Sequence, residues 1–116
     1  MKNAKPWALP PYKGPKPQFW LVAAFKMTNA EMRNMLGVPH FTETDSMRTF
    51  GGNEDYWSYE LQSGQHLSVC SQVPYGIVHL YTDKPDLNEI LDALELPADL
   101  VADRSRFETY DQPIRI

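Results

Sequence analysis

The sequence lacks the features that mark secreted, membrane or disulfide-bonded proteins. Its 116 residues contain one cysteine, Cys70, so no disulfide can form within the chain, and a secreted domain of this size often needs several. The longest apolar run, residues 19–25, has seven residues, whereas a membrane helix needs about 20. Prolines interrupt the N-terminus where a signal peptide would need an apolar core. We therefore expect a cytoplasmic protein with no membrane segment.

The motifs of common metal and catalytic sites are also missing. The three histidines, His40, His66 and His79, form no HxH or HExxH pattern, so the usual spacing of metal ligands is absent. No GxSxG elbow and no Walker-type loop occurs. Cys70 falls in the middle of an expected strand, where a cysteine is more often an inert packing residue than a thiolate nucleophile. We therefore expect no metal, no cofactor and no catalytic residue.

Acidic residues are absent from the first 26 positions, which carry five lysines. The rest of the chain holds all fifteen acidic residues and six basic ones, a net charge of −9. A strongly acidic body repels nucleic acid and attracts a basic protein. The charge pattern therefore predicts a basic protein partner and argues against binding to nucleic acid.

Residues 1–18 form a basic leader that contains five of the ten prolines. This composition excludes a helix or a central strand. One interpretation is a flexible or polyproline-type lead-in. The other is an arm that lies over the acidic body and is held there by Trp7, Leu9 and Tyr12. In either case we expect residues 19–116 to form the single folded domain.

One short helix has unusually clear boundaries, in the stretch MTNAEMRNMLGVPHF. Thr28 and Glu31 have the spacing of a capping box, and methionines and a leucine recur at three and four residues to give one apolar face. Gly37 is the expected left-handed stop, and Pro39 prevents the helix from resuming. His40 follows this corner, and nothing near it in the sequence marks it as a catalyst.

Several further segments follow the alternation of strands or the three-to-four spacing of helices. Residues 42–55 are polar and contain a Gly-Gly pair, so we expect a loop there. The expected strands are 19–25, 56–61, 66–73 and 77–82. A short strand at 47–50 and an edge strand at 107–110 are expected in addition. A second helix is expected to start at residue 86 and either to stop at Pro97 or to continue beyond it as a short helical turn. This order predicts a single α+β domain: an antiparallel sheet of about four strands with two short helices packed on it.

Acidic and aromatic residues lie together in the stretch GGNEDYWSYE and in the polar segment before it. Alternation places Trp57 and Tyr59 in the core and Tyr56 on the opposite face. Aromatic anchors ringed by acids suit a basic partner, because the aromatics supply desolvated contact and the acids speed the encounter. The candidate partner-binding residues are Glu43, Asp45, Glu54, Asp55, Tyr56 and Glu60. The open alternative is an ordinary half-buried strand beside a solvated acidic loop.

The middle of the chain resembles the core of the SmpA/BamE-like outer-membrane lipoproteins. The matching residues are Thr28, Glu31, Leu36, Gly37, Pro39, Trp57 and Tyr59. In that family a short helix ends at LGxP and the chain enters an antiparallel meander, so the resemblance implies this architecture for residues 27–82. The signal peptide and lipobox cysteine of the family have no counterpart in the sequence. A role in envelope assembly is therefore not implied.

In overall character the chain is similar to bacterial immunity proteins of contact-dependent inhibition and other polymorphic toxin systems. Such proteins are small, single-domain, cytoplasmic and often acidic, and they cover the active site of a cognate toxin. The resemblance implies a non-catalytic binding module that neutralises a basic, nuclease-type toxin domain. Two alternatives stay open: a small ligand-binding or enzymatic domain with a pocket near His40, Cys70 or His79, and a subunit of a larger assembly.

Overall fold

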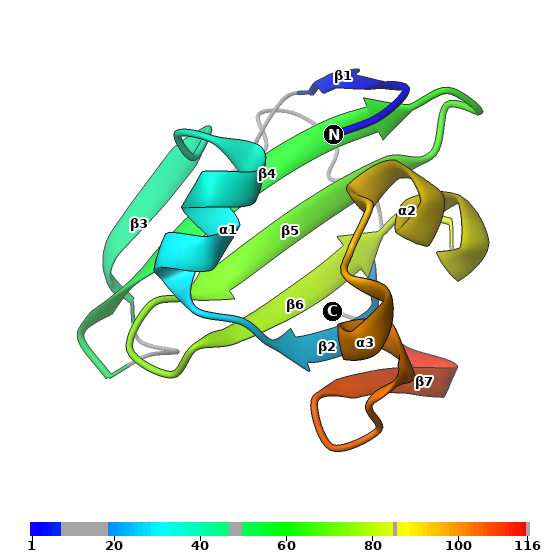
Figure 1. Ribbon diagram of the computed structural model, residues 1–116. Helices are drawn as coiled ribbons and strands as arrows, with labels where there is room; N and C mark the ends of the chain where they lie inside the picture. Colours follow the sequence, from blue (N-terminus) through cyan, green and yellow to red (C-terminus); the bar gives the residue numbers. More distant parts are fainter. Residues whose placement is uncertain (8–18, 47–49, 85, 116) are drawn as a thin grey trace.

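The computed structural model describes residues 1–7, 19–46, 50–84 and 86–115, and of residues 45–46 and 111–115 it describes the backbone alone. In these residues seven strands form one sheet, and three short helices accompany it (Figure 1). In chain order the elements are β1 (Ala4–Pro6), β2 (Trp20–Lys26), α1 (Asn29–Leu36), β3 (Phe41–Ser46), β4 (Gly52–Leu61), β5 (His66–Gln72), β6 (Ile77–Thr82), α2 (Leu87–Leu94), α3 (Ala98–Ala102) and β7 (Phe107–Arg115).

The sheet is antiparallel throughout, with the strand order β1-β4-β5-β6-β2-β7 and with β3 also paired to β4. β4 has ten residues, so its outer edge holds two strands end to end. β3 pairs along Gly52–Tyr56 and β1 along Tyr59–Leu61. The predicted α+β class with an antiparallel sheet is confirmed. The expected number of about four strands is wrong, because the sheet has seven, and the helices number three among the described residues, where two were expected.

The strands that the sequence did not reveal lie at the outer edges of the sheet. The polar segment expected as a loop contains β3, whose Phe41 lies opposite Tyr56 on β4. An edge strand has one partner and can be polar on its exposed parts, so it lacks the apolar alternation by which central strands are recognised. β1 contains Pro6, which an edge strand tolerates because the missing N–H faces no neighbour. Of the short strand expected at 47–50, residues 47–49 lie outside the described residues and Phe50 is in a turn.

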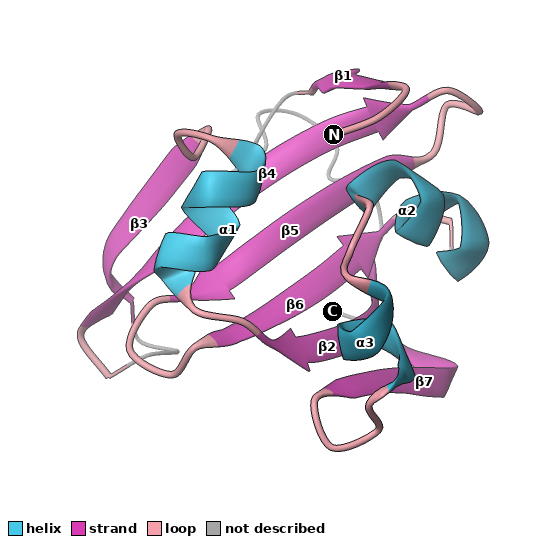
Figure 2. Ribbon diagram, in the orientation of Figure 1, coloured by secondary structure: helices cyan, strands magenta, loops and turns pink. Residues whose placement is uncertain are grey.

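All three helices lie on the same face of the sheet (Figure 2). Strand alternation turns apolar side chains of β4, β5, β6 and β2 toward these helices, and their packing forms the main core. Trp57, at its centre, is completely buried, and its indole N–H donates to the carbonyl of Gly37 at 3.2 Å. The largest fully buried apolar residues include Trp57, Phe25, Met32, Leu67, Leu80, Ile90, Leu94 and Leu100. No helix among the described residues is long and apolar enough to cross a membrane.

The α1 boundaries are those that the sequence predicts. Thr28 Oγ1 accepts from the backbone N–H of Glu31 at 3.1 Å, and the Glu31 carboxylate accepts from the N–H of Thr28 at 3.2 Å. This reciprocal pair is the capping box, and its hydrogen bonds from Thr28 lower the pKa of Glu31. Gly37 has φ +85° and donates its N–H to the carbonyl of Arg33. Positive φ favours glycine there, which explains the abrupt end of the helix.

Candidate functional site

The six residues predicted to bind a partner do not share one exposed surface in the described structure. Glu54 and Asp55 are completely buried and Tyr56 is 7% exposed, whereas Glu43 is exposed and the Glu60 side chain is 29% exposed. Asp45 lies in β3, but its side chain is outside the described part. Successive residues of β4 point to opposite faces of the sheet, so the side chains of Glu54 and Asp55 contact different groups.

Asp55 fastens α1 and β3 to the sheet. Its Oδ2 accepts from Arg33 Nη2 at 2.8 Å, from Arg33 Nε at 3.0 Å and from Asn29 Nδ2 at 2.8 Å, and its Oδ1 accepts from Thr42 Oγ1 at 2.7 Å. Burial pushes the pKa of Asp55 up, but the hydrogen bonds from Thr42, Asn29 and Arg33 outweigh it and hold the pKa below its usual value. The carboxylate is therefore an internal structural ion.

Glu54 forms a separate buried cluster on the helix-free face of the sheet. Its Oε2 accepts from the Tyr56 hydroxyl at 2.8 Å and from the Cys70 thiol at 2.9 Å. Tyr56 also lies 3.4 Å from Glu43 Oε2. A carboxylate that accepts from a phenol and a thiol offsets part of the cost of its burial. The cluster holds β4 to β5 through polar contacts.

The alternative pocket near His40, Cys70 and His79 is not assembled by these elements. Cys70 lies directly opposite His79 in the pairing of β5 with β6, on the helix-free face. The thiol is completely buried, so no substrate reaches it in this conformation. His40 lies elsewhere, at the outer edge of β4, where its ring contacts Tyr59 edge-on at 5.1 Å between centroids. The three side chains do not converge on one concave site.

His40 completes the backbone pairing of β4 at the point where β3 ends. Its Nδ1 accepts from the N–H of Ser58 at 3.0 Å, and its own N–H donates to the carbonyl of Tyr56 at 2.9 Å. The ladder of β3 stops at Tyr56 and that of β1 stops at Tyr59. The imidazole therefore supplies the acceptor that neither strand provides, which is a structural role.

Residues 1–7 lie over the body, as the arm interpretation expects of the leader. The N–H of Lys2 donates to the carbonyl of Ala93 on α2 at 2.9 Å, and the N–H of Trp7 donates to the carbonyl of Ser58 at 3.1 Å. Lys5 Nζ forms an ion pair with Glu60 at 2.9 Å. The other two anchors expected for this arm, Leu9 and Tyr12, lie outside the described residues.

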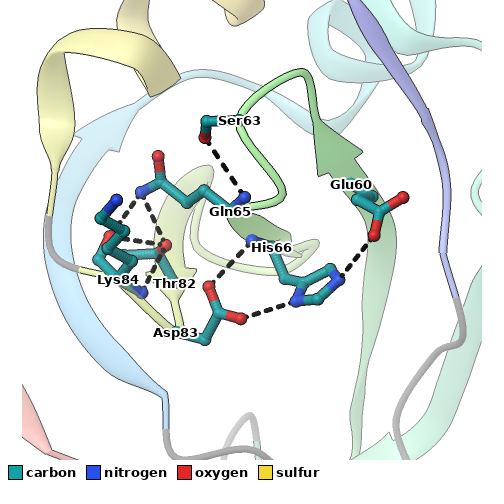
Figure 3. Close-up of polar contacts among 7 residues, drawn as sticks. All are labelled: Glu60, Ser63, Gln65, His66, Thr82, Asp83 and Lys84. Atoms are coloured by element: carbon teal, nitrogen blue, oxygen red, sulfur yellow. Dashed lines mark hydrogen bonds and ion pairs between the residues drawn. The ribbon is translucent and has the colours of Figure 1, made fainter.

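A row of polar side chains centres on the ring of His66 (Figure 3). The Oδ2 atom of Asp83 is 2.6 Å from Nδ1 of the ring, and Glu60 Oε1 is 3.3 Å from Nε2. Trp7 stacks on the ring with centroids 3.8 Å apart. The hydrogen bond from Lys5, followed by a weaker contribution from His66, lowers the pKa of Glu60. Sequence reasoning missed this row because its members are far apart in the chain.

Gln65 fixes the segment that leads into α2 next to this row (Figure 3). Its side-chain amide donates to Thr82 Oγ1 at 2.9 Å, to the carbonyl of Asp86 at 3.0 Å and to the carbonyl of Lys84. The side chain is 2% exposed. These bonds place the start of α2 against the turn between β4 and β5, where Glu89 accepts from the hydroxyl and N–H of Ser63.

The most acidic surface lies over α2 and α3, which sequence reasoning did not select. Residues 83–103 contain seven acids and one base, Lys84. Four of the acids are exposed and three are partly buried. These acids are Asp83, Asp86, Glu89, Asp92, Glu95, Asp99 and Asp103, and the exposed ones, Asp86, Asp92, Glu95 and Asp99, form the α2–α3 surface. The signal that could have identified this surface is the regular spacing of its acids, three or four residues apart.

The described residues bring together no group of three or more metal-binding side chains. Fold and site thus define a small α+β protein with structural carboxylates inside and an acidic helical surface outside. In comparisons with known proteins, the chain matches no family model, no curated protein and no solved structure. The resemblances to immunity proteins and to SmpA/BamE-like proteins stay predictions.

Proposed function

We propose that the protein is a non-catalytic binding module that holds a basic protein against its α2–α3 surface. The observation that carries this proposal is the separation of charge: one segment of 21 residues has seven acids against a single lysine, while the first 26 residues have lysines and no acid. Such a one-sided field attracts a cationic partner and orients it before contact.

The specific form of the proposal is an immunity protein that neutralises a nuclease-type toxin domain. A nuclease binds the phosphate backbone with lysines and arginines. A surface with exposed carboxylates at Asp92, Glu95 and Asp99 presents anions to such a basic groove and competes with the nucleic acid for it. The partner-binding role predicted for the β3–β4 segment passes to α2–α3, because Glu54 and Asp55 are buried.

The test uses two variants with the same change in net charge. Asp92→Lys with Asp99→Lys reverses two exposed acids of the α2–α3 surface, and Glu43→Lys with Glu108→Lys reverses two exposed acids on strands. Each purified protein is immobilised and exposed to a lysate of the native cell at low salt, and captured proteins are identified by mass spectrometry.

The wild type and the strand variant are expected to retain the same basic protein, and the α2–α3 variant to retain at least tenfold less of it. Co-expression with the wild type should then suppress the toxicity of that basic protein. Equal retention by both variants, or capture of no basic protein at low salt, would contradict the proposal.

A further inference from the structure

The outer edge of β4 between Tyr59 and Leu61 is a docking position that the chain fills with its own N-terminus. β1 pairs there, with Lys5 opposite Glu60. The Lys2 N–H also donates to the carbonyl of Ala93, and the Trp7 N–H donates to the carbonyl of Ser58. The Trp7 ring stacks on His66 and on Phe19, and Met1 and Ala4 pack against the main core. Main-chain pairing with pockets for alternate side chains is the way in which proteins bind extended peptides at a sheet edge.

The strand pairing of the arm is shorter than that of the other described strands of the sheet. β1 is three residues long, and Lys5 and Pro6 are exposed. Pro6 cannot donate to the ladder, and the Lys5–Glu60 ion pair joins a lysine side chain that is 75% exposed, a kind of pair that stabilises little. Segments with few buried contacts and exposed hydrogen bonds open at low free energy.

The arm also leaves part of its site unfilled. An open groove of about 570 Å³ lies beside it, lined by Asn3, Lys5, Glu60 and Ser63 among others. A second hollow of about 420 Å³ continues toward α2 and is lined by Lys2, Asn3, Gln62, Glu89, Asp92 and Ala93. The walls therefore combine carboxylates of β4 and of the α2–α3 surface. A longer basic segment would find more acidic partners here than the arm uses.

The chemistry of this edge defines its ligand. Glu60 pairs with a cationic side chain of the ligand, and the ring of His66 stacks on an aromatic side chain two residues later in the ligand. The β4 backbone pairs with an extended strand. The arm sequence MKNAKPW meets these demands with Lys5 and Trp7. A basic, extended segment with the same spacing in another protein would fit in the same way.

We propose that residues 1–7 are a placeholder, and that an extended basic segment of the protein partner displaces them and pairs with β4 in their place. The identity of that natural occupant rests on the proposed function, whereas peptide binding at this edge does not. Eleven residues separate Trp7 from Phe19 in the sequence, so the arm competes for this edge as part of the same chain, which favours it over a segment of a separate molecule. A competing segment must overcome this advantage.

The probe is a fluorescently labelled peptide with the sequence MKNAKPW, measured by fluorescence anisotropy against full-length protein. The arm is weakened by Lys5→Ala with Trp7→Ala, and the same background with Glu60→Lys reverses the charge of the receiving edge. The arm-weakened protein is expected to bind the peptide at least tenfold more tightly than the wild type. Glu60→Lys should abolish this binding and accept the charge-reversed peptide MENAEPW instead.

A second measurement on the unaltered chain guards against loss of folding in the variants. In hydrogen exchange, the amides of Lys2 and Trp7 should exchange at least a hundredfold faster than those of β5. Arm amides as protected as those of β5, or no peptide binding by the folded arm-weakened protein, would overturn the proposal. A stable dimer that excludes the peptide would also overturn it, because the second copy's arm would then be the occupant. Equal capture of the basic protein by the two charge variants would contradict the proposed function and leave the peptide-binding result intact.

Discussion

The neighbouring acids Glu54 and Asp55 have different structural roles, which are set by the groups that each carboxylate contacts. Asp55 meets a guanidinium, an amide and a hydroxyl on the helix face, whereas Glu54 meets a phenol and a thiol on the other face. Strand alternation predicts that the two point apart. It does not predict that both are buried, because Arg33 and Cys70 are 22 and 16 residues away in the chain. The sequence therefore shows where the acids are in the chain, but it does not predict which of them are buried in the fold.

Replacing Asp55 by asparagine should lower the free energy of unfolding by about 2 kcal/mol, because Arg33, Asn29 and Thr42 lose a buried charged acceptor. The Asp55 pKa is lowered in the folded state, so its stabilisation is complete above the unfolded value of about 4 and is lost as pH falls through the folded value. The difference between wild type and variant should thus shrink on acidification below about pH 4. Urea unfolding across pH 3–7 measures both effects. Asp99→Asn, on exposed α3, is the control and should change stability little; a pH-independent difference would contradict this account.

His40 should prove to be a structural residue. His40→Ala leaves the Ser58 N–H without its acceptor, which should lower the free energy of unfolding by about 1–2 kcal/mol. His40→Asn places an amide oxygen close to the position of Nδ1 and should recover more than half of the loss. Thermal denaturation followed by circular dichroism compares the two variants. Equal destabilisation by alanine and asparagine would show that the hydrogen bond to Ser58 is not the reason for the loss.

At the scale of elements, local signals were predictable and edge pairing was not. The α1 caps, the apolar face of α2 and the alternating strands β4, β5 and β6 depend on a few consecutive residues each. They occur where expected, except that β4 begins at Gly52, inside the segment expected as a loop. β1 and β3 depend instead on the length of β4, whose outer edge exceeds what either strand covers alone. Long-range pairing of polar or proline-containing segments leaves no periodic trace. For that reason β1 and β3 were not predicted, and β7 was predicted shorter than it is.

The capping box of α1 gives an element-scale prediction. Thr28→Ala removes the two hydrogen bonds of the Thr28 hydroxyl, one from the Glu31 N–H and one to the Glu31 carboxylate, and keeps the bond from the backbone N–H of residue 28. It should lower the free energy of unfolding by about 1 kcal/mol. Thr28→Ser keeps the hydroxyl and should be close to wild type. Hydrogen exchange of the α1 amides should accelerate in the alanine variant ahead of those of β5, because the helix end frays first. An alanine variant as stable as the serine variant would contradict a role for the cap.

At the scale of the whole molecule, charge is segregated along the chain and then brought together by folding. The basic arm pairs along the outer edge of β4 and reaches the last turn of α2 at Ala93, so the most acidic segment and the cationic leader meet at Lys2, Glu89 and Asp92. The arm therefore touches the margin of the surface that we propose for the partner. A field of this kind acts over about a Debye length, 8 Å at physiological salt, and so acts before contact.

The proposed field should appear in the rate of association more than in the rate of dissociation. For the captured basic partner, raising the salt concentration from about 50 mM to about 500 mM should slow association with the wild type at least tenfold, because screening removes the steering. Asp92→Lys with Asp99→Lys should associate slowly at both concentrations, with a much smaller dependence on salt, while Glu43→Lys with Glu108→Lys should keep a salt dependence close to that of the wild type. Surface plasmon resonance separates the two rate constants. If the association rates of the wild type and the α2–α3 variant fell equally with salt, the charge that steers the partner would lie elsewhere on the molecule. Only a charge that faces the approaching partner can change how its association rate depends on salt.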